Sequence, residues 1–316
     1  MFNQTDLITL QKGDLINHYL LLKKTEIKLT KTNKQYLYLE FTDKTLSLSA
    51  NVWENFSNYS QLKSGDIVKV TGSMDDYNGV PQIKIISIKL VEPGDNISAI
   101  DFLARSKRDI DEMKNELLAR IQKITNRKLK MLIDLFFKED KLMKFTSAPA
   151  GKYWHHSYLS GLLEHSLELI KICDLMCDIH PEINRDLLIC GAIMHDYGKT
   201  EELSFDASFE YTTRGKLIGH IVISAMMINE ECKKIPDFPD ELRDCLLHLI
   251  LSHQGKLEFA SPVIPKTLEA ITLYQADELS AKVNAYKSAL GETKEGKWTK
   301  YLPLASTDLF NHSIQQ

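Results

Sequence analysis

The residues with the clearest capacity for chemistry lie in the stretch 191–200, GAIMHDYGKT, where His195 and Asp196 stand side by side. They end an apolar run, 187–190, that predicts a buried helix. Neighbouring residues on a helix point about 100° apart, so this pair cannot chelate one ion from one face. The pair can serve two directions at the helix end, and we therefore expect further metal ligands from other segments.

Four further candidate ligands lie in or at the end of separate apolar segments with helical spacing. In chain order they are His165, His220, His253 and Asp277. Imidazole and carboxylate together suit Mn, Fe, Ni or Zn rather than Ca. A buried Asp277 without a cation partner would also be costly. These residues predict a metal centre that several helices assemble.

The order His, His-Asp, His, His, Asp resembles the HD-domain metal-dependent phosphohydrolases, and the resemblance implies two metal ions. The ligands implied for the first are His165, His195, Asp196 and Asp277, and those for the second, to which Asp196 bridges, are His220 and His253. Mn²⁺ is the metal expected first, with Fe, Ni, Co or Mg as alternatives. Gln254 stands where cyclic-dinucleotide phosphodiesterases of this group have a second histidine, which disfavours that branch.

Two cations about 3.5–4 Å apart activate a shared water and neutralise a phosphodiester during in-line attack. Asp196, as the bridging ligand, and Lys199, one turn further on, are the expected catalytic residues; the alternative for Lys199 is a surface lysine. His156 is interpreted as a substrate-phosphate contact or else a surface or capping histidine. If a continuous helix joined them, His155 and His156 would lie roughly 14–15 Å from His165, too far for shared ligation unless the chain turns.

Residues 14–92 carry the signals of β structure. Alternating stretches at 35–43 and 45–53, a third strand at 67–72 and a last one at 82–85 are separated by turn residues, including the hairpin signal Tyr77-Asn78-Gly79. Leu37, Leu39 and Phe41 should face the core. Several short strands in about 80 residues predict a small closed barrel, and the layout resembles an OB fold.

Three aromatic residues of this barrel fall on its polar face: Tyr36, Tyr38 and Trp53. One interpretation is that they stack on unpaired bases while neighbouring lysines meet the phosphate backbone. The other is that they cover a barrel face or an interdomain contact. The sequence alone leaves both open.

The predicted fold class is therefore multidomain α and β, with an OB-like barrel before an all-α HD-type domain. The expected boundaries are 1–95 for the barrel, 96–146 for a helical connector and 147–316 for the HD-type domain, with Pro93-Gly94-Asp95-Asn96 as the break. A small hairpin around 206–208 is expected over the metal site.

The composition argues against several classes of protein. No apolar run approaches the roughly 20 residues of a membrane span, and the first residues do not resemble a signal peptide, so we expect a cytoplasmic protein without membrane contact. The five cysteines lie in apolar helical segments, which argues against a disulfide framework. A net charge of −4 argues against a generally basic nucleic-acid coat.

The barrel, the helices, the segment 155–165 (HHSYLSGLLEH) and the His-Asp centre together resemble the YhaM family of bacterial 3′→5′ exoribonucleases over nearly the whole chain. The resemblance alone implies single-stranded RNA as substrate, with single-stranded DNA as a further candidate, and nucleoside 5′-monophosphates as products. A homo-oligomer is a further expectation. Two alternatives remain: an HD phosphohydrolase of nucleotides or signalling nucleotides, and a non-catalytic RNA-binding module with a structural metal.

Overall fold

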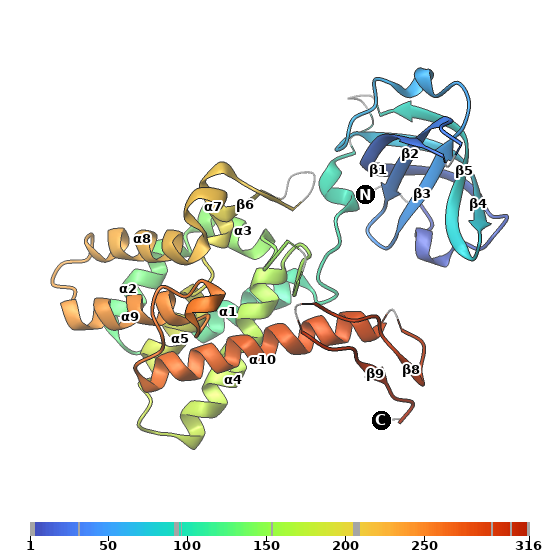
Figure 1. The fold of residues 1–316 in the computed structure, drawn as a ribbon. Coiled ribbons are helices and arrows are strands. Elements are labelled where there is room, and N and C mark those ends of the chain that lie inside the picture. The colour runs from blue at the N-terminus through green and yellow to red at the C-terminus, as the bar shows by residue number, and fades with distance from the viewer. Residues whose placement is uncertain are drawn as a thin grey trace. The chain divides into compact units, whose positions relative to one another are not determined.

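A computed structural model describes residues 4–30, 32–91, 95, 97–152, 154–204, 209–291, 293–303 and 305–314. The chain forms two compact units, one up to Arg105 and a helical one from Ser106 onward. Figure 1 shows the strands of the first unit and the helices of the second. Within the predicted boundary, Pro93, Gly94 and Asn96 lie outside the described residues.

The first unit is a closed barrel with the strand order β1-β2-β3-β5-β4. Its strands are β1 (Leu15–Leu29), β2 (Gln35–Thr42), β3 (Ser47–Val52), β4 (Ile67–Tyr77) and β5 (Val80–Leu90), accompanied by the short helices η1 (Leu7–Thr9), η2 (Phe56–Tyr59) and η4 (Ala99–Phe102). The β3 and β5 strands pair in parallel and close the barrel, whereas the other neighbours are antiparallel. The predicted OB-like barrel is confirmed.

Alternation along β2 divides core from surface as the sequence predicts. Leu37, Leu39 and Phe41 are buried in the barrel core, while the residues between them are partly exposed. The hairpin between β4 and β5 turns through Asn78 and Gly79, which have φ of 54° and 80°. Both residue types tolerate the left-handed region that a tight hairpin requires.

The helical unit is built around helices α5 and α10, which pack on each other and each pack on both α4 and α9. Its helices are α1 (Ile110–Gln122), α2 (Arg127–Phe136), α3 (Glu139–Ser147), α4 (Gly161–Ile179), α5 (Arg185–Met194), α6 (Lys199–Glu202), α7 (Thr213–Ile218), α8 (His220–Cys232), α9 (Asp240–Ser252), η5 (Leu257–Phe259) and α10 (Leu268–Gly291). Helices α1 and α3 pack on α4, and α2 packs on α5 and α8. The helices expected as a connector thus join the helical unit, because their apolar faces complete its core.

The apolar run before the His-Asp pair forms α5, in which every residue from Leu187 to Met194 is buried. The Asn184 side chain caps its first turn by accepting from the Leu187 N–H. Helix α5 ends at Met194, and a turn through His195 and Asp196 leads into α6. The predicted buried helix is confirmed, and its end delivers the pair.

The remaining elements are short. Strands β6 (Leu203–Ser204) and β7 (Glu210–Tyr211) pair as the arms of the predicted hairpin, whose tip, 205–208, lies outside the described residues. Strands β8 (Lys297–Trp298) and β9 (Phe310–Asn311) form a second hairpin. All five cysteines are free thiols in the structure. Among the described residues, none of the helices combines the length and apolar character needed to span a membrane.

Candidate metal centre

Five helices of the helical unit bring the predicted ligands together. His165 comes from α4, His195 and Asp196 from the turn after α5, His220 from the first residue of α8, His253 from the end of α9, and Asp277 from the middle of α10. His165, His195, Asp196 and His253 are each at most 2% exposed. The centre is thus enclosed by the helices that supply it.

These six residues form two clusters of three, each with donor atoms within 4.8 Å of one another: His165, His195 and Asp277, then Asp196, His220 and His253. In the first cluster, His165 Nε2 lies 3.0 Å from Asp277 Oδ1. In the second, His220 and His253 Nε2 lie 3.3 and 3.6 Å from Asp196 Oδ1.

Asp196 connects the two clusters through its two carboxylate oxygens. Oδ1 faces His220 and His253, whereas Oδ2 lies 3.2 Å from His195 Nε2 and 4.0 Å from His165 Nε2. A carboxylate placed in this way can bridge two ions, because each oxygen faces its own set of imidazoles. This geometry would allow Asp196 to bridge two ions, and that bridging role stays a prediction.

The far nitrogen of each imidazole is anchored by a second residue. His195 and His253 donate from Nδ1 to the carbonyl oxygens of Ala192 and Ile250, over 2.9 and 2.7 Å. Since a carbonyl can only accept, the proton sits on Nδ1, and Nε2 keeps its lone pair. Such anchoring orients histidines that bind metals.

The other two imidazoles are anchored by side chains. His220 Nδ1 lies 3.0 Å from Glu202 Oε1. His165 Nδ1 lies 3.1 Å from Ser280 Oγ, and Ser280 donates its own proton to Glu168 Oε2 over 2.7 Å. The serine oxygen therefore accepts from His165, which leaves Nε2 of His165 facing the cluster.

Four of the inward-facing atoms are buried without a hydrogen-bond partner: Nε2 of His165, His195 and His220, and Oδ1 of Asp196. Buried polar atoms are rarely left unpaired in proteins, and each unpaired one costs free energy. Nitrogen and oxygen donors that converge in this way fit a divalent metal. The six residues could therefore hold metal ions, and their role as ligands stays a prediction.

The ionisation of the site also suits cation binding. Burial lowers the pKa of His253 to about 4 and that of His165 well below its ordinary value, so both are neutral ligands. Burial alone would raise the pKa of Asp196, but the nearby Lys199 and His195 outweigh it and hold that pKa well below normal. Burial opposes charge on His195 too, yet the Asp196 carboxylate raises its pKa, and a bound cation would compete with that proton.

Lys199 is buried rather than on the surface, so its surface alternative is wrong. Its Nζ lies 2.5 Å from Asp196 Oδ2, and only 7% of the residue is exposed. Burial would lower its pKa, but the Asp196 carboxylate outweighs burial and raises it. The ammonium is thus a fixed positive charge inside the centre.

The structure places His155 and His156 against the centre, contrary to the distance inferred from a continuous helix. Helix α4 begins only at Gly161, and the chain turns before it, with His156 at φ 43°. The rings of His155 and His156 lie 5.0 and 5.2 Å from that of His165. His156 is 1% exposed, so it is not a surface histidine; whether it contacts a substrate phosphate stays a prediction.

Sequence reasoning missed three residues that orient the ligands: Glu168, Glu202 and Ser280. A signal for two of them was present, since Glu168 and Ser280 each stand three positions after a ligand on the same helix, where side chains share a face. Glu202 has no such signal, because α6 and α8 meet only in the tertiary structure.

On the barrel, the structure brings Tyr36 and Trp53 together. Their rings stack with centroids 4.6 Å apart and planes at 28°, and Trp53 stays 48% exposed. Lys28 Nζ lies 3.5 Å from the centre of the Tyr38 ring. The three aromatic residues thus form one outward face with an accessible indole. This face suits stacking on bases, and it equally suits aromatic residues that only cover the barrel.

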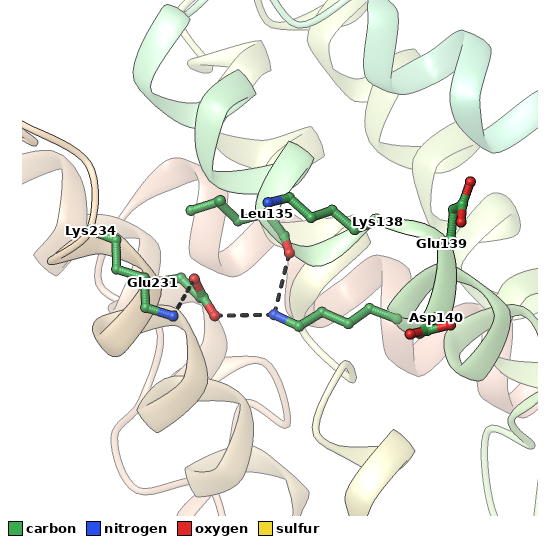
Figure 2. A pocket seen from close by; sticks show the side chains of 7 residues that line it. Leu135, Lys138, Glu139, Asp140, Glu231 and Lys234 are labelled. Atoms are coloured by element: carbon green, nitrogen blue, oxygen red, sulfur yellow. Dashed lines mark hydrogen bonds and ion pairs between the residues drawn. The ribbon is translucent and has the colours of Figure 1, made fainter.

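An open cleft of about 620 Å³ lies elsewhere on the helical unit, between the α2–α3 turn and the end of α8. Figure 2 shows Glu231 and Lys234 among the residues that line it. The Nζ atoms of Lys141 and Lys234 lie 3.1 and 2.9 Å from the Glu231 carboxylate. Lys141 also donates to the Leu135 carbonyl. These mutually neutralising pairs contain none of the metal-centre residues, so we assign the chemistry to the buried centre.

Barrel and centre together define an HD-type hydrolase joined to an OB-fold nucleic-acid-binding domain. The HD domain family matches residues 162–282, and the OB-fold nucleic acid binding domain family matches residues 23–91. The chain belongs to the YhaM family of 3′-5′ exoribonucleases. It is 34% identical to 3′-5′ exoribonuclease YhaM of Oceanobacillus iheyensis over 295 residues, which cover 92% of this chain and 91% of that protein.

Two further relatives have the same name. The Geobacillus protein is 34% identical over 289 residues, covering 91% of this chain and 89% of its own length. The Bacillus subtilis protein is 32% identical, covering 91% of each chain. The predicted family, the OB-like and HD-type folds and the hydrolase class are confirmed, and an HD domain implies dependence on a divalent metal.

Proposed function

We propose that this protein degrades single-stranded RNA from its 3′ end to nucleoside 5′-monophosphates, using two divalent cations, with Mn²⁺ expected first. The observation that supports this most strongly is the position of the Asp196 carboxylate, whose two oxygens face separate sets of imidazoles. RNA and the direction of cleavage rest on the names of the relatives. Single-stranded DNA is a second candidate substrate.

In this proposal, His165, His195, Asp196 and Asp277 hold one cation, and Asp196, His220 and His253 hold the other. When bound, the two cations would supply an activated water and neutralise the scissile phosphate. The chain's own residues hold the imidazoles in place through their Nδ1 atoms and exclude bulk water. Lys199 would add a fixed positive charge for the phosphate, because its ammonium is already buried beside Asp196.

The barrel would bind the single strand. Trp53, half-exposed and backed by Tyr36, offers a flat surface for a base, and every base has a face that can stack on it. Tyr38 would extend this surface along β2. Such stacking tolerates any sequence, which suits an exonuclease.

A release assay separates the candidate functions. The protein with Mn²⁺ is given RNA oligomers labelled at either end, the matching DNA, and free nucleotides. Labelled mononucleotides released first from the 3′ end of RNA support the proposal. Phosphate or pyrophosphate released only from nucleotides would instead support the nucleotide phosphohydrolase, and oligomer binding without turnover the non-catalytic module.

A further inference from the structure

We propose that His156, Glu164 and Glu168 form a third cation site, which borders the metal centre and is separate from its two clusters. One donor atom from each of these residues lies within 4.8 Å of the others. Two ligands on opposite sides of an ion are about 4.2 Å apart when each bond is about 2.1 Å. Only a small contraction would therefore be needed to enclose an ion.

The nitrogen that faces this site is buried and makes no hydrogen bond. Nε2 of His156 is among the buried unpartnered atoms of the described residues, and it lies 3.3 Å from Glu168 Oε2. One imidazole with two carboxylates is a set that suits Mn²⁺ and its neighbours in the first transition row.

The backbone around His156 fixes its ring in this position. Its carbonyl oxygen accepts from the N–H groups of Ala150 and Tyr158, over 3.1 and 2.9 Å, and its own N–H donates to Asn284 Oδ1. A Cβ added at Gly161 would lie 2.0 Å from the same carbonyl oxygen, so only glycine permits this approach. The left-handed conformation of His156 is costly and is held by these contacts.

Neutral groups hold the two carboxylates. Glu164 Oε2 accepts from Ser106 Oγ and Tyr158 OH, over 2.5 and 3.0 Å, and Glu168 Oε2 accepts from Ser280 Oγ. Hydroxyl donors orient a carboxylate without cancelling its charge. The two negative charges thus remain for a cation, and at 39% exposure the Glu168 side chain lets that cation exchange with solvent.

The third site is connected to the centre through Ser280, which contacts both Glu168 and Nδ1 of His165. A cation on Glu168 would draw electron density from the hydrogen bonds that link Glu168, Ser280 and His165, and would alter how firmly His165 is oriented. The competing explanation is an ion pair between a protonated His156 and Glu168. That explanation predicts no ion between the three side chains.

The test counts Mn²⁺ bound to the full-length protein by electron paramagnetic resonance, and locates it by anomalous diffraction from Mn²⁺-soaked crystals. We expect the double variant Glu164→Gln/Glu168→Gln to bind one Mn²⁺ fewer per chain than the parent, while Glu182→Gln, an exposed control, binds as the parent does. The parent should show a peak between His156, Glu164 and Glu168.

Equal Mn²⁺ counts in parent and double variant, or no peak at that position under saturating Mn²⁺, would overturn the proposal. If the double variant does not fold, as a melting curve would show, the peak position in the parent decides by itself. Neither readout depends on RNA hydrolysis, so failure of the proposed exonuclease activity would be seen separately.

Discussion

Replacing Asp196 with asparagine removes the one charge that both clusters share. In the metal-free protein, its carboxylate is also the close partner of the buried Lys199 ammonium. Breaking one partner of a buried pair costs about 3–5 kcal/mol, because the other charge is left uncompensated. Asp277 and Glu202 also attract this ammonium, so we expect the lower end, about 3 kcal/mol.

That cost can be read from a melting curve in EDTA. For a unit of this size, 1 kcal/mol corresponds to about 2–4 °C, so Asp196→Asn should lower Tm by about 6–12 °C. Lys199→Met alone removes the ammonium from beside the Asp196 carboxylate and should also lower Tm. The double variant Asp196→Asn/Lys199→Met removes both charges and should recover most of the lost stability.

Activity should behave differently from stability. Loss of the bridging charge weakens both cation sites, so kcat/KM on labelled single-stranded RNA should fall at least about 10³-fold, equivalent to about 4 kcal/mol. The double variant should stay inactive although it is stable, and RNA binding by the barrel should persist in both. Activity within tenfold of the parent, or a double variant no more stable than Asp196→Asn, would refute the reasoning.

Three further outcomes are expected. His220→Ala or His253→Ala should preferentially empty the second cation position in Mn²⁺-soaked crystals, and equal occupancy of both positions in variant and parent would contradict this. Tyr38→Ala and Trp53→Ala should each weaken binding of long RNA by about 1–3 kcal/mol while sparing hydrolysis of a small phosphodiester; a matched loss on both substrates with a lowered Tm would return these residues to a packing role. In EDTA, the free energy of unfolding should fall by about 3 kcal/mol between pH 6.5 and about 4 through His253, because the unfolded histidine takes up a proton near 6.5 while the folded one stays neutral until about 4. Urea unfolding across this range checks it, and an equally steep dependence in His253→Ala would contradict it.

The sequence predicts which six residues come together, because four of them are histidines in or at the end of apolar helical segments. That these residues bind metal stays a prediction. His195 and Asp196 follow an apolar run that the structure buries throughout. The expectation of a buried Asp277 is wrong, since 16% of its side chain is exposed, although its Oδ1 still lies 3.0 Å from His165 Nε2. The barrel is predictable for a similar reason. Alternation along β2 distinguishes two faces within a few residues, and the Asn78-Gly79 turn determines the pairing of its neighbours.

The turn at His156 could not be predicted, because nothing local requires it. A histidine at positive φ is uncommon, and here it is held by Asn284, 128 residues away, and by the space that Gly161 leaves open. The distance of about 14–15 Å holds only for a continuous helix, and the sequence left open whether the chain turns. Tertiary contacts decide for the turn and bring the rings of His155 and His156 to 5.0 and 5.2 Å from that of His165.

The role predicted for Lys199 depends on its contact with Asp196. The sequence places it one turn after Asp196, which suggests a charge for the substrate, whereas the structure pairs its ammonium with Asp196 Oδ2. The same oxygen faces His195 and His165, where the first cation is proposed. An ammonium and a divalent ion that approach one oxygen repel each other, so cation binding would weaken this pair. The ammonium would then be available to a phosphate, which reconciles its observed contact with its proposed role.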